Sequence, residues 1–540
     1  MPSSSAFQNP RSTLTHLPMS PLPPPPPHQP YHHSPALTRP RRQVPLPYSN
    51  TALPESSLSL PTRPGSPILT ESRLEDSSIN RAPRWTRRDV CLVDMLHDDV
   101  LLAIFDFCVE LETWQMVVHV CRRWRSVVFG SPRRLNLRLI CSAKTPARDT
   151  LDIWPVLPLL IHANYRLPIE RVDNIVAVLE RSSRVHQIAL LGVSGSHLEV
   201  LAAMQGPFPE LTHLTLRSSG TVPALPDLFL GGSVPRLQIL HFRGIPFPGL
   251  PNLLLSAPHL FDLSLYDIPH SGYFSPEAMA AALSTLTSLR TLRLEFQSPQ
   301  SRPDRAGRRP PPSTRFVLPD LTLFWFKGVS EYLDELVARI NAPRLESLDI
   351  TLFNQIVFDA PQVIQFICRT PTMNALEKAR FTFGRGGVFV SLSSKASREQ
   401  GLKVTIPCTE LDWQVSSLEQ VFNSCLPPLS TLEDLYISEY PIWLPEWQDN
   451  IENVLWLELL RPFTGVKNLY LSEEFALRIV PALQELVGGR TTEVLPTLQN
   501  IFVERLEPSG LVQEGIGQLV SMRQVTGHPI VVSRQDDFFW

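Results

Sequence analysis

The chain has 540 residues, of which 54 are proline, with 43% apolar residues and a formal net charge of −3. An interior proline costs roughly 3 kcal/mol in a helix and is confined to the edges of sheets, so a continuous helical bundle is excluded. The 49 basic and 52 acidic residues nearly balance, so no global field selects nucleic acid or an anionic membrane as a partner.

The cysteine count and the hydropathy pattern favour a reducing compartment. Seven cysteines without a CxxC pair argue against a disulfide framework and against a structural zinc site. The sequence has no secretory signal and no run of about 18 apolar residues that would span a membrane. We therefore expect a soluble intracellular protein, cytoplasmic or nuclear, without a metal or cofactor.

Residues 1–85 form a separate compositional block. They hold 19 of the 54 prolines, many serines and few large apolar residues. Such a segment buries too little surface to offset the entropy of ordering, so we predict that it is disordered. The run Pro23–Pro27 favours polyproline II and is interpreted either as part of an inert tail or as a ligand for an aromatic-lined groove.

Two helical stripes follow between residues 96 and 130. Asp98 and Asp99 form an acidic start before apolar residues at helical spacing, from Val100 to Cys108. A second stripe runs from Trp114 to Val128, and Pro132 stops it. A unit this small does not make a secure core alone, which predicts a neighbouring domain or a partner.

This segment, residues 90–140, resembles an F-box. The resemblance rests on the run from Leu96 to Phe105 and on Val120-Cys121-Arg122-Arg123-Trp124. His97 stands where the family has proline, and Asp99 stands where it has glutamate. The resemblance implies docking to a Skp-type adaptor, and an unrelated helical hairpin is the alternative. The positions that it assigns to docking or to the F-box core are Leu96, Val100, Leu101, Ile104, Phe105, Val117, Val120 and Trp124.

An internal repeat begins at residue 185. In each unit the first, fourth and sixth residues are apolar, as in Leu211-Leu214-Leu216. The last two apolar positions alternate, so they face one side of a short strand. Six copies are preceded by Pro-x, where the missing N–H and the restricted preceding residue mark the start of a strand. The copies start at Val185, Leu211, Leu237, Leu260, Leu289, Leu321, Leu345, Leu376, Leu432, Val466 and Leu498, with a partial copy at Val404 and Ile406.

Helical stretches lie between the predicted strands. Ser275-Pro276-Glu277 combines a capping serine, a first-turn proline and an acid. A second helix begins at Ser330 with Ile340 at the end of its apolar face, and others are predicted at 415–426, 451–460 and 475–487, the last interrupted by Pro481.

This alternation of strand and helix resembles leucine-rich repeats. It predicts an α/β fold, with a small all-α F-box and a connecting helical region at 141–184 before a solenoid at 185–530. The family's turn asparagine is missing, so the turns must be closed in another way and the repeats are irregular. The solenoid is expected to hold a protein partner on its parallel sheet.

No constellation of residues predicts catalysis, so we expect an adaptor and not an enzyme. Gly384 to Gly387 lacks the lysine of a phosphate-binding loop and is interpreted as a surface turn. The basic insertion at 298–315 has no interleaved aromatic residue, which argues against nucleic acid and favours a flexible loop. The C-terminal tail, 531–540, either caps the solenoid or serves as a docking segment.

Disordered tail, F-box and irregular repeats together resemble the F-box-like family of mushroom-forming, basidiomycete fungi. The match includes the segment from Cys121 to Leu139 and Asp152-Ile153-Trp154-Pro155. It implies the substrate-recognition adaptor of a Skp–cullin–F-box ubiquitin ligase, which binds a Skp-type adaptor, through it a cullin, and an unknown protein substrate. The alternative is a protein-interaction scaffold outside ubiquitination. The chain has six lysines against 43 arginines, which reflects either GC-rich codons or a receptor that resists its own modification.

Overall fold

The computed structural model describes residues 95–535, with gaps at 109–113, 143–150, 165–171, 300–313, 356, 396–399, 426–428, 441–450, 487–489, 491 and 505–510. The chain divides into two units, 1–88 and 89–540, and all described residues belong to the second unit. The predicted disordered tail at 1–85, most of the insertion at 298–315 and residues 536–540 lie outside the described residues.

Three short helices open the described chain, α1 (Asp98–Cys108), α2 (Trp114–Val118) and α3 (Arg122–Gly130). Nδ1 of His97 accepts a hydrogen bond from the backbone N–H of Asp99 at 3.4 Å, so this residue caps α1 without the proline of the F-box pattern. The second predicted stripe, from Trp114 to Val128, is divided between α2 and α3. Cys121 has extended backbone (φ −155°, ψ 169°), and its Sγ accepts from the N–H of Trp124 at 3.4 Å, which starts a new helix.

The three helices share a small core that continues into the following chain. Leu101, Phe105, Trp114 and Val128 are buried. The indole N–H of Trp114 donates to the carbonyl oxygen of Arg138 at 3.1 Å, and its ring meets the edge of Trp154 at 5.2 Å. The helical unit is therefore packed against the segment that leads into the sheet.

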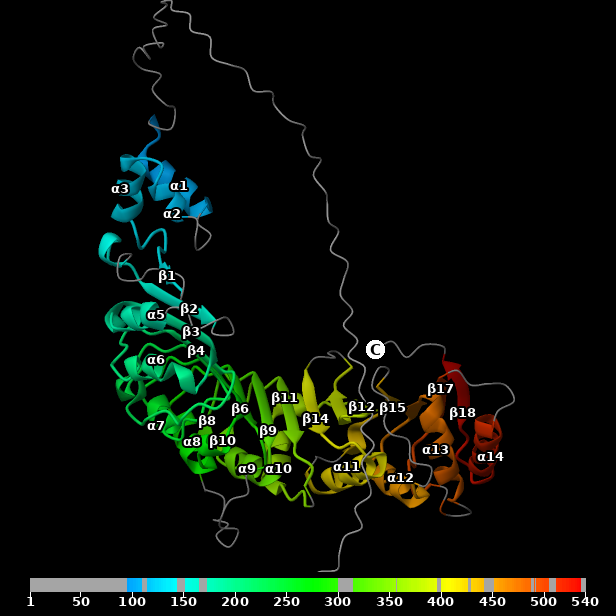
Figure 1. Cartoon of the computed structure of the whole chain (residues 1–540). Helices are drawn as coiled ribbons and strands as arrows, with labels where there is room; N and C mark the ends of the chain where they lie inside the picture. Colours follow the sequence, from blue (N-terminus) through cyan, green and yellow to red (C-terminus); the bar gives the residue numbers. More distant parts are fainter. Residues whose placement is uncertain are drawn as a thin grey trace, which may run out of the picture. The chain divides into compact units, whose positions relative to one another are not determined.

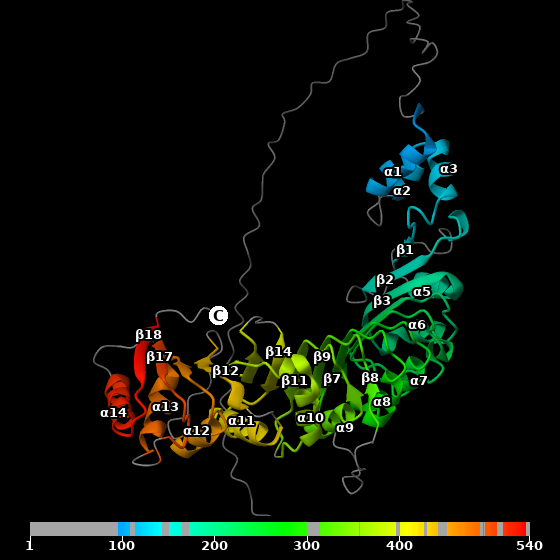
Figure 2. The ribbon, with the colours of Figure 1, turned by 180° about the vertical axis from the view of Figure 1, so that it is seen from behind.

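The rest of the described chain forms one long sheet with helices on one of its faces (Figures 1 and 2). The repeat pattern predicted twelve strands, and all twelve are present. In spatial order the strands are β1 (Leu139–Cys141), β2 (Leu159–Asn164), β3 (Val185–Val193), β4 (His213–Ser218), β5 (Ile239–Arg243), β6 (Asp262–Ile268), β7 (Thr291–Phe296), β9 (Leu323–Gly328), β11 (Ser347–Leu352), β14 (Gly401–Ile406), β13 (Gly387–Ser393), β12 (Lys378–Gly384), β15 (Asp434–Glu439), β16 (Asn468–Leu471), β17 (Asn500–Glu504) and β18 (Val531–Gln535).

The covering helices follow the strands in chain order. They are α5 (Val172–Leu179), α6 (Leu198–Ala203), α7 (Leu250–Leu254), α8 (Pro276–Leu283), α9 (Ser330–Val337), α10 (Pro361–Arg369), α11 (Leu411–Cys425), α12 (Asn453–Leu460), α13 (Glu473–Gln484) and α14 (Leu511–Val525). The cap predicted at Ser275 is present, because its hydroxyl accepts from the N–H of Ala278 at 3.2 Å. Two short strands, β8 (Phe316–Val317) and β10 (Ile340–Asn341), pair separately.

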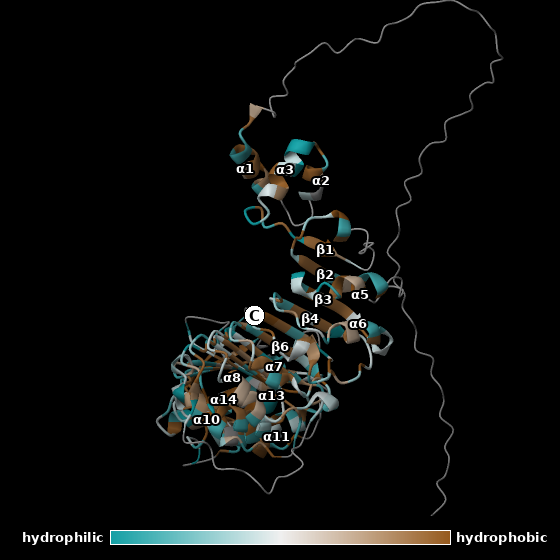
Figure 3. Ribbon diagram, turned by 90° about the vertical axis from the view of Figure 1, so that its left-hand side faces the viewer, coloured by the Kyte–Doolittle hydropathy of each residue, from teal (hydrophilic) through white to brown (hydrophobic). Residues whose placement is uncertain are grey.

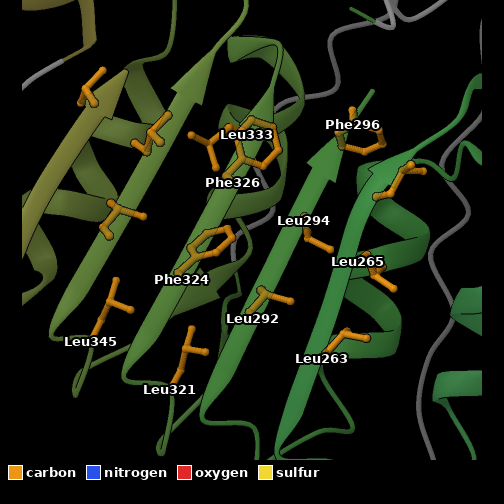
Figure 4. Packing of buried hydrophobic residues seen from close by; sticks show 14 of the residues in the cluster. Leu263, Leu265, Leu292, Leu294, Phe296, Leu321, Phe324, Phe326, Leu333 and Leu345 are labelled. Carbon is orange, nitrogen blue, oxygen red and sulfur yellow. The ribbon is translucent and has the colours of Figure 1, made fainter. Parts of the chain in front are cut away.

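Alternation along the strands divides the sheet into a helix-covered face and an open face. Leu292 and Leu294 of β7 are fully buried, as are Phe324 and Phe326 of β9, while the residues between them are half-buried. Figure 4 shows these side chains packed in one layer from strand to strand. In Figure 3, β1 to β3 are coloured mostly as hydrophobic. The core is therefore a continuous layer between the sheet and the helices.

The six Pro-x prolines occupy tight turns. In each case the residue before the proline accepts a backbone hydrogen bond from the repeat's first leucine three positions later, for example Val234 from Leu237 at 3.1 Å. Proline thus stands at the second position of a β-turn, for which its fixed φ is suited. The six prolines are Pro209, Pro235, Pro258, Pro319, Pro343 and Pro496.

Backbone hydrogen bonds between neighbouring repeats replace the missing turn asparagine. The N–H of Ser219 donates to the carbonyl oxygen of Val193 at 3.0 Å, and that of Gln297 donates to Ile268 at 2.9 Å. The orphan carbonyl groups after one strand are therefore satisfied by the next repeat. This confirms the expectation that the turns are closed in another way.

Four other expectations are corrected by the structure. The sheet begins before residue 185, since β1 and β2 belong to it, and the region 141–184 is not purely helical. The predicted strand pattern missed β13, which is antiparallel to β12 and β14. Pro481 does not interrupt its helix, because α13 continues through it. The proline lacks the N–H of one helical hydrogen bond, and α13 packs against α12 and α14. Ile340 lies in β10 and not on the face of α9.

Candidate protein-interaction surfaces

The residues predicted on α1 to α3 separate into a buried group and an exposed group. Leu101 and Phe105 are 1% and 2% exposed and form the core of the unit. Trp124 is half-buried against the edge of Phe105, with ring centroids 5.0 Å apart. Leu96 and Val117 are also half-buried against this core.

The exposed group forms an apolar surface on α1, α2 and the turn after α2. Val100, Ile104 and Val120 were predicted from sequence and are 45%, 43% and 61% exposed. Phe107 and Met116, which the sequence did not single out, are 95% and 74% exposed. Large apolar side chains at this exposure favour an interaction site over a free surface. We call these five residues the helical apolar surface.

The basic residues of α3 hold the helical unit together. Nη2 of Arg123 lies 2.8 Å from a carboxylate oxygen of Asp98, and Nη1 of Arg134 lies 3.1 Å from Asp99. Nε of Arg125 donates to the carbonyl oxygen of Val118 at 3.0 Å. Arg123 and Arg125 therefore join α3 to α1 and α2, and Arg134 joins the following turn to α1.

The open face is the second candidate surface. Strand register places one residue from each strand in a row across its centre, which we call the middle row. From β3 to β18 the row reads Ala189, Thr215, His241, Ser264, Arg293, Trp325, Asp349, Lys403, Ser391, Arg380, Tyr436, Tyr470, Phe502 and Ser533.

Arg293 is held between two aromatic rings of this face. Its guanidinium carbon lies 5.9 Å from the ring centre of Tyr266 and 5.4 Å from that of Trp325. Its Nη1 donates to the hydroxyl of Tyr266 at 2.6 Å. Cation–π contact and a hydrogen bond together fix the position of this cation.

Two carboxyl groups near Arg293 are partly desolvated. Burial raises the pKa of Asp349, and the nearby Lys403 and Arg293 oppose that rise. Burial also raises the pKa of Glu295, against the opposing effect of Lys327. Both carboxyl groups therefore occupy partly buried positions close to basic side chains of the open face.

On β15 to β17 the middle row carries a stack of aromatic rings. The rings of Tyr436 and Tyr470 are parallel within 6° and 4.1 Å apart, and those of Tyr470 and Phe502 are within 10° and 4.6 Å apart. The guanidinium of Arg380 lies 5.4 Å from the ring centre of Tyr436. Desolvation raises the pKa of Tyr470, so its hydroxyl stays neutral. We call Tyr436, Tyr470 and Phe502 the aromatic stack.

The row beside the aromatic stack carries connected amides. Nδ2 of Asn500 donates to Oδ1 of Asn468 at 2.8 Å, and Nδ2 of Asn468 donates to Asp434 at 2.7 Å. Directly before β15, the carboxylate of Glu433 accepts hydrogen bonds from both Lys395 and Lys467, at 2.5 and 2.6 Å. These two lysines depress the pKa of Glu433 to about 2. The polar groups of this half therefore link one repeat to the next.

The sequence did not predict the middle row. Most residues in it lie between two apolar positions of a repeat, which marks their face but not their neighbours. Irregular spacing between repeats and the unpredicted β13 hide which residues meet across strands. The alternation itself was the signal that located the open face.

The other sequence candidates have structural explanations within the described residues. The glycine-rich segment from Gly384 to Gly387 forms the hairpin between β12 and β13, as a turn and not a phosphate site. Among the residues that the structure describes, no cluster of His, Cys, Asp or Glu is arranged to hold a metal. None of the described helices is long and apolar enough to cross a membrane.

Comparison with known proteins found similarity to solved structures. No protein-family model matches the chain, and no curated protein matches it. The chain is similar to the leucine-rich repeat-containing protein LegL7 from Legionella pneumophila, with 14% identity and a TM-score of 0.24 over 71% of this chain and 97% of that one. The repeat solenoid of this chain follows from its own strand order, register and burial pattern.

Proposed function

We propose that this protein is the substrate-recognition adaptor of a Skp–cullin–F-box ubiquitin ligase. The helical apolar surface would bind a Skp-type adaptor, and the open face would bind a protein substrate. The protein would act by proximity, because it would hold a substrate lysine near a ubiquitin carrier on another chain and raise the local concentration. The catalytic groups would belong to the other chains.

The observation that carries this proposal is the separation of α1–α3 into two sets of apolar residues. Leu101 and Phe105 make the core, while Ile104 and Phe107 on the same helix remain exposed. An isolated helical unit of this size would bury its large apolar residues, so these side chains favour a partner. The sequence resemblance to an F-box supplies the identity of that partner.

The departure at His97 and Asp99 favours a second candidate. Where the F-box pattern has proline, His97 is 79% exposed at its side chain, and Asp99 pairs with Arg134. An adaptor that requires the proline and the glutamate would bind this surface weakly. The chain would then be an interaction scaffold that has the helical unit but no role in ubiquitination.

Co-expression of the full chain with a Skp-type adaptor and a cullin tests the proposal. Ile104→Asp puts a charge into the helical apolar surface, and we expect recovery of the adaptor to fall at least tenfold. Leu477→Asp on α13 is the matched control, because Leu477 is 44% exposed and Ile104 is 43% exposed. The control should retain the adaptor.

Two results would contradict the ligase role. In the first, the wild-type chain recovers neither adaptor nor cullin although it is folded. In the second, Ile104→Asp and Leu477→Asp lower recovery equally, which would show a general effect of the charge. Either result would leave the interaction scaffold as the better description.

A further inference from the structure

The open face has a charge opposite to that of the chain as a whole. Between β7 and β17 its outward positions carry five basic residues and four acidic residues, a difference of +1, whereas the whole chain has a net charge of −3. The basic residues are Arg293, Lys327, Lys378, Arg380 and Lys403, and the acidic residues are Glu295, Asp349, Asp434 and Glu504.

The acidic residues of this region are partly or fully withdrawn from solvent. Asp434 is 7% exposed and accepts a hydrogen bond from Asn468 at 2.7 Å. Asp349 and Glu295 are partly desolvated, as described above. In the middle row itself, three basic side chains (Arg293, Lys403 and Arg380) stand against one acidic side chain, Asp349.

The basic part of the row runs directly into the aromatic stack. Arg380 neighbours Tyr436 across the strands and lies over its ring. Rings that are already stacked on one another lose little conformational freedom when a partner side chain packs against them. The face therefore offers a basic region at one end and a rigid apolar region at the other.

We propose that the open face from β7 to β17 binds an extended acidic segment of a protein partner that carries an aromatic or aliphatic anchor at one end. The acidic side chains contact Arg293, Lys403 and Arg380, and the anchor packs on Tyr470 and the rest of the aromatic stack. This inference rests on the proposed function, because it names the chemical class of the substrate held by the solenoid.

The length of the bound segment follows from the sheet. From β7 to β17 there are eight steps between neighbouring strands, and each step spans about 4.8 Å. An extended peptide covers about 3.3 Å per residue, so a segment of roughly 12 residues crosses these strands. The segment lies across the side chains of the open face and does not pair its backbone with an edge strand. Its recognition therefore depends on side-chain chemistry.

Charge also discriminates between this partner and two other occupants. The Pro-rich segment 1–85 holds more arginines than acidic residues, so it does not complement a basic face. A second copy of the chain that docked through its own open face would present the same basic charge. An acidic segment of another protein is therefore the occupant that the charge pattern favours.

Binding of labelled peptides to the purified full chain, followed by fluorescence anisotropy, tests the proposal. The probe is a peptide of roughly 12 residues with glutamates and one terminal tryptophan. The two comparison peptides replace glutamate by lysine, or tryptophan by serine. We expect the acidic tryptophan peptide to bind most tightly and its affinity to fall as salt is added.

Two substitutions in the middle row should act in opposite directions. Lys403→Gln removes a basic charge and should weaken binding about threefold to tenfold, whereas Asp349→Asn should strengthen it by a similar factor. Arg344→Gln is the control for a lost positive charge, because this side chain is 72% exposed in a turn outside the open face. Tyr470→Ala should remove the preference for tryptophan over serine.

The proposal fails if the lysine peptide binds as tightly as the glutamate peptide, if no peptide binds, or if Lys403→Gln matches Arg344→Gln. It also fails if the chain self-associates through this face and the acidic peptide does not compete. These measurements use no Skp-type adaptor, and adaptor recovery tested with Ile104→Asp uses no peptide. Failure of the substrate class is thus distinguishable from failure of the ligase role.

Discussion

Arg523 of α14 is a buried cation that is bonded to the last turn before β17. It is 1% exposed, and its Nη1 and Nη2 donate to the carbonyl oxygens of Leu495 and Val494 at 3.3 and 2.9 Å. Desolvation lowers the pKa of this guanidinium. Leu495 has a positive φ of 50°, which is unfavourable for a residue with a side chain, so the two bonds hold a strained turn.

Replacement of Arg523 by methionine keeps most of the apolar stem and removes both hydrogen bonds. Each bond from a charged donor contributes about 1.5–3 kcal/mol, and the two carbonyl groups lose their partner. Relief of the buried charge offsets part of this loss, so we expect a net destabilisation of about 2–4 kcal/mol. Because repeats contact mainly their neighbours, the effect should remain near β17 and β18.

Hydrogen exchange of the backbone amides measures this local effect. A loss of 2–4 kcal/mol should accelerate exchange in β17 and β18 by roughly 30- to 700-fold, with β4 unchanged. Arg490→Met, which removes a side chain that is 66% exposed, is the control and should change exchange little. Equal acceleration in β4 and β17 would refute local coupling, and less than about threefold acceleration in β17 would refute the role of Arg523.

Two further predictions concern a turn and an ion pair. Pro235→Ala should lower stability by about 0.4–1 kcal/mol through the unfolded chain, because the proline is exposed and its turn can form with alanine; a loss above about 2 kcal/mol in chemical denaturation would contradict this. The pKa of Glu433 lies at about 2 instead of its ordinary 4.5, because of Lys395 and Lys467, so its contribution to stability is present above pH 4.5 and is lost as pH falls toward 2. The melting temperatures of wild type and Glu433→Gln should therefore differ at pH 6 and become equal near pH 2. A difference in melting temperature that is unchanged by acid would refute this role of Glu433.

The strands were predictable because the same physical requirement recurs in every repeat. A leucine such as Leu214 must face the helices, and a second such as Leu216 must follow two residues later, whatever the length of the connection. The signal of β13 was weaker. Val388 and Val390 alternate in the same way, but the strand lacks the preceding turn and leucine of a repeat.

The candidate surfaces were less predictable than the strands, for two different reasons. On α1, helical periodicity marks Ile104 and Phe105 as apolar neighbours but does not say which one faces solvent, since that depends on how three short helices pack. On the open face, Lys403 and Arg380 come into the same row only because β13 lies between their strands. Register across repeats is a property of the assembled sheet.

The distribution of lysine supports a functional role for the basic face. GC-rich codons are one of the two explanations for six lysines against 43 arginines, and they predict no preferred location for the lysines. In the described part of the chain, Lys327, Lys378 and Lys403 lie on the open face, and Lys395 and Lys467 lie at its edge beside Glu433. The described residues of the helix-covered side contain arginine but no lysine. Scarcity and location therefore need separate explanations. A compact, strongly hydrated ammonium group suits a half-buried position that contacts carboxylates of a bound segment.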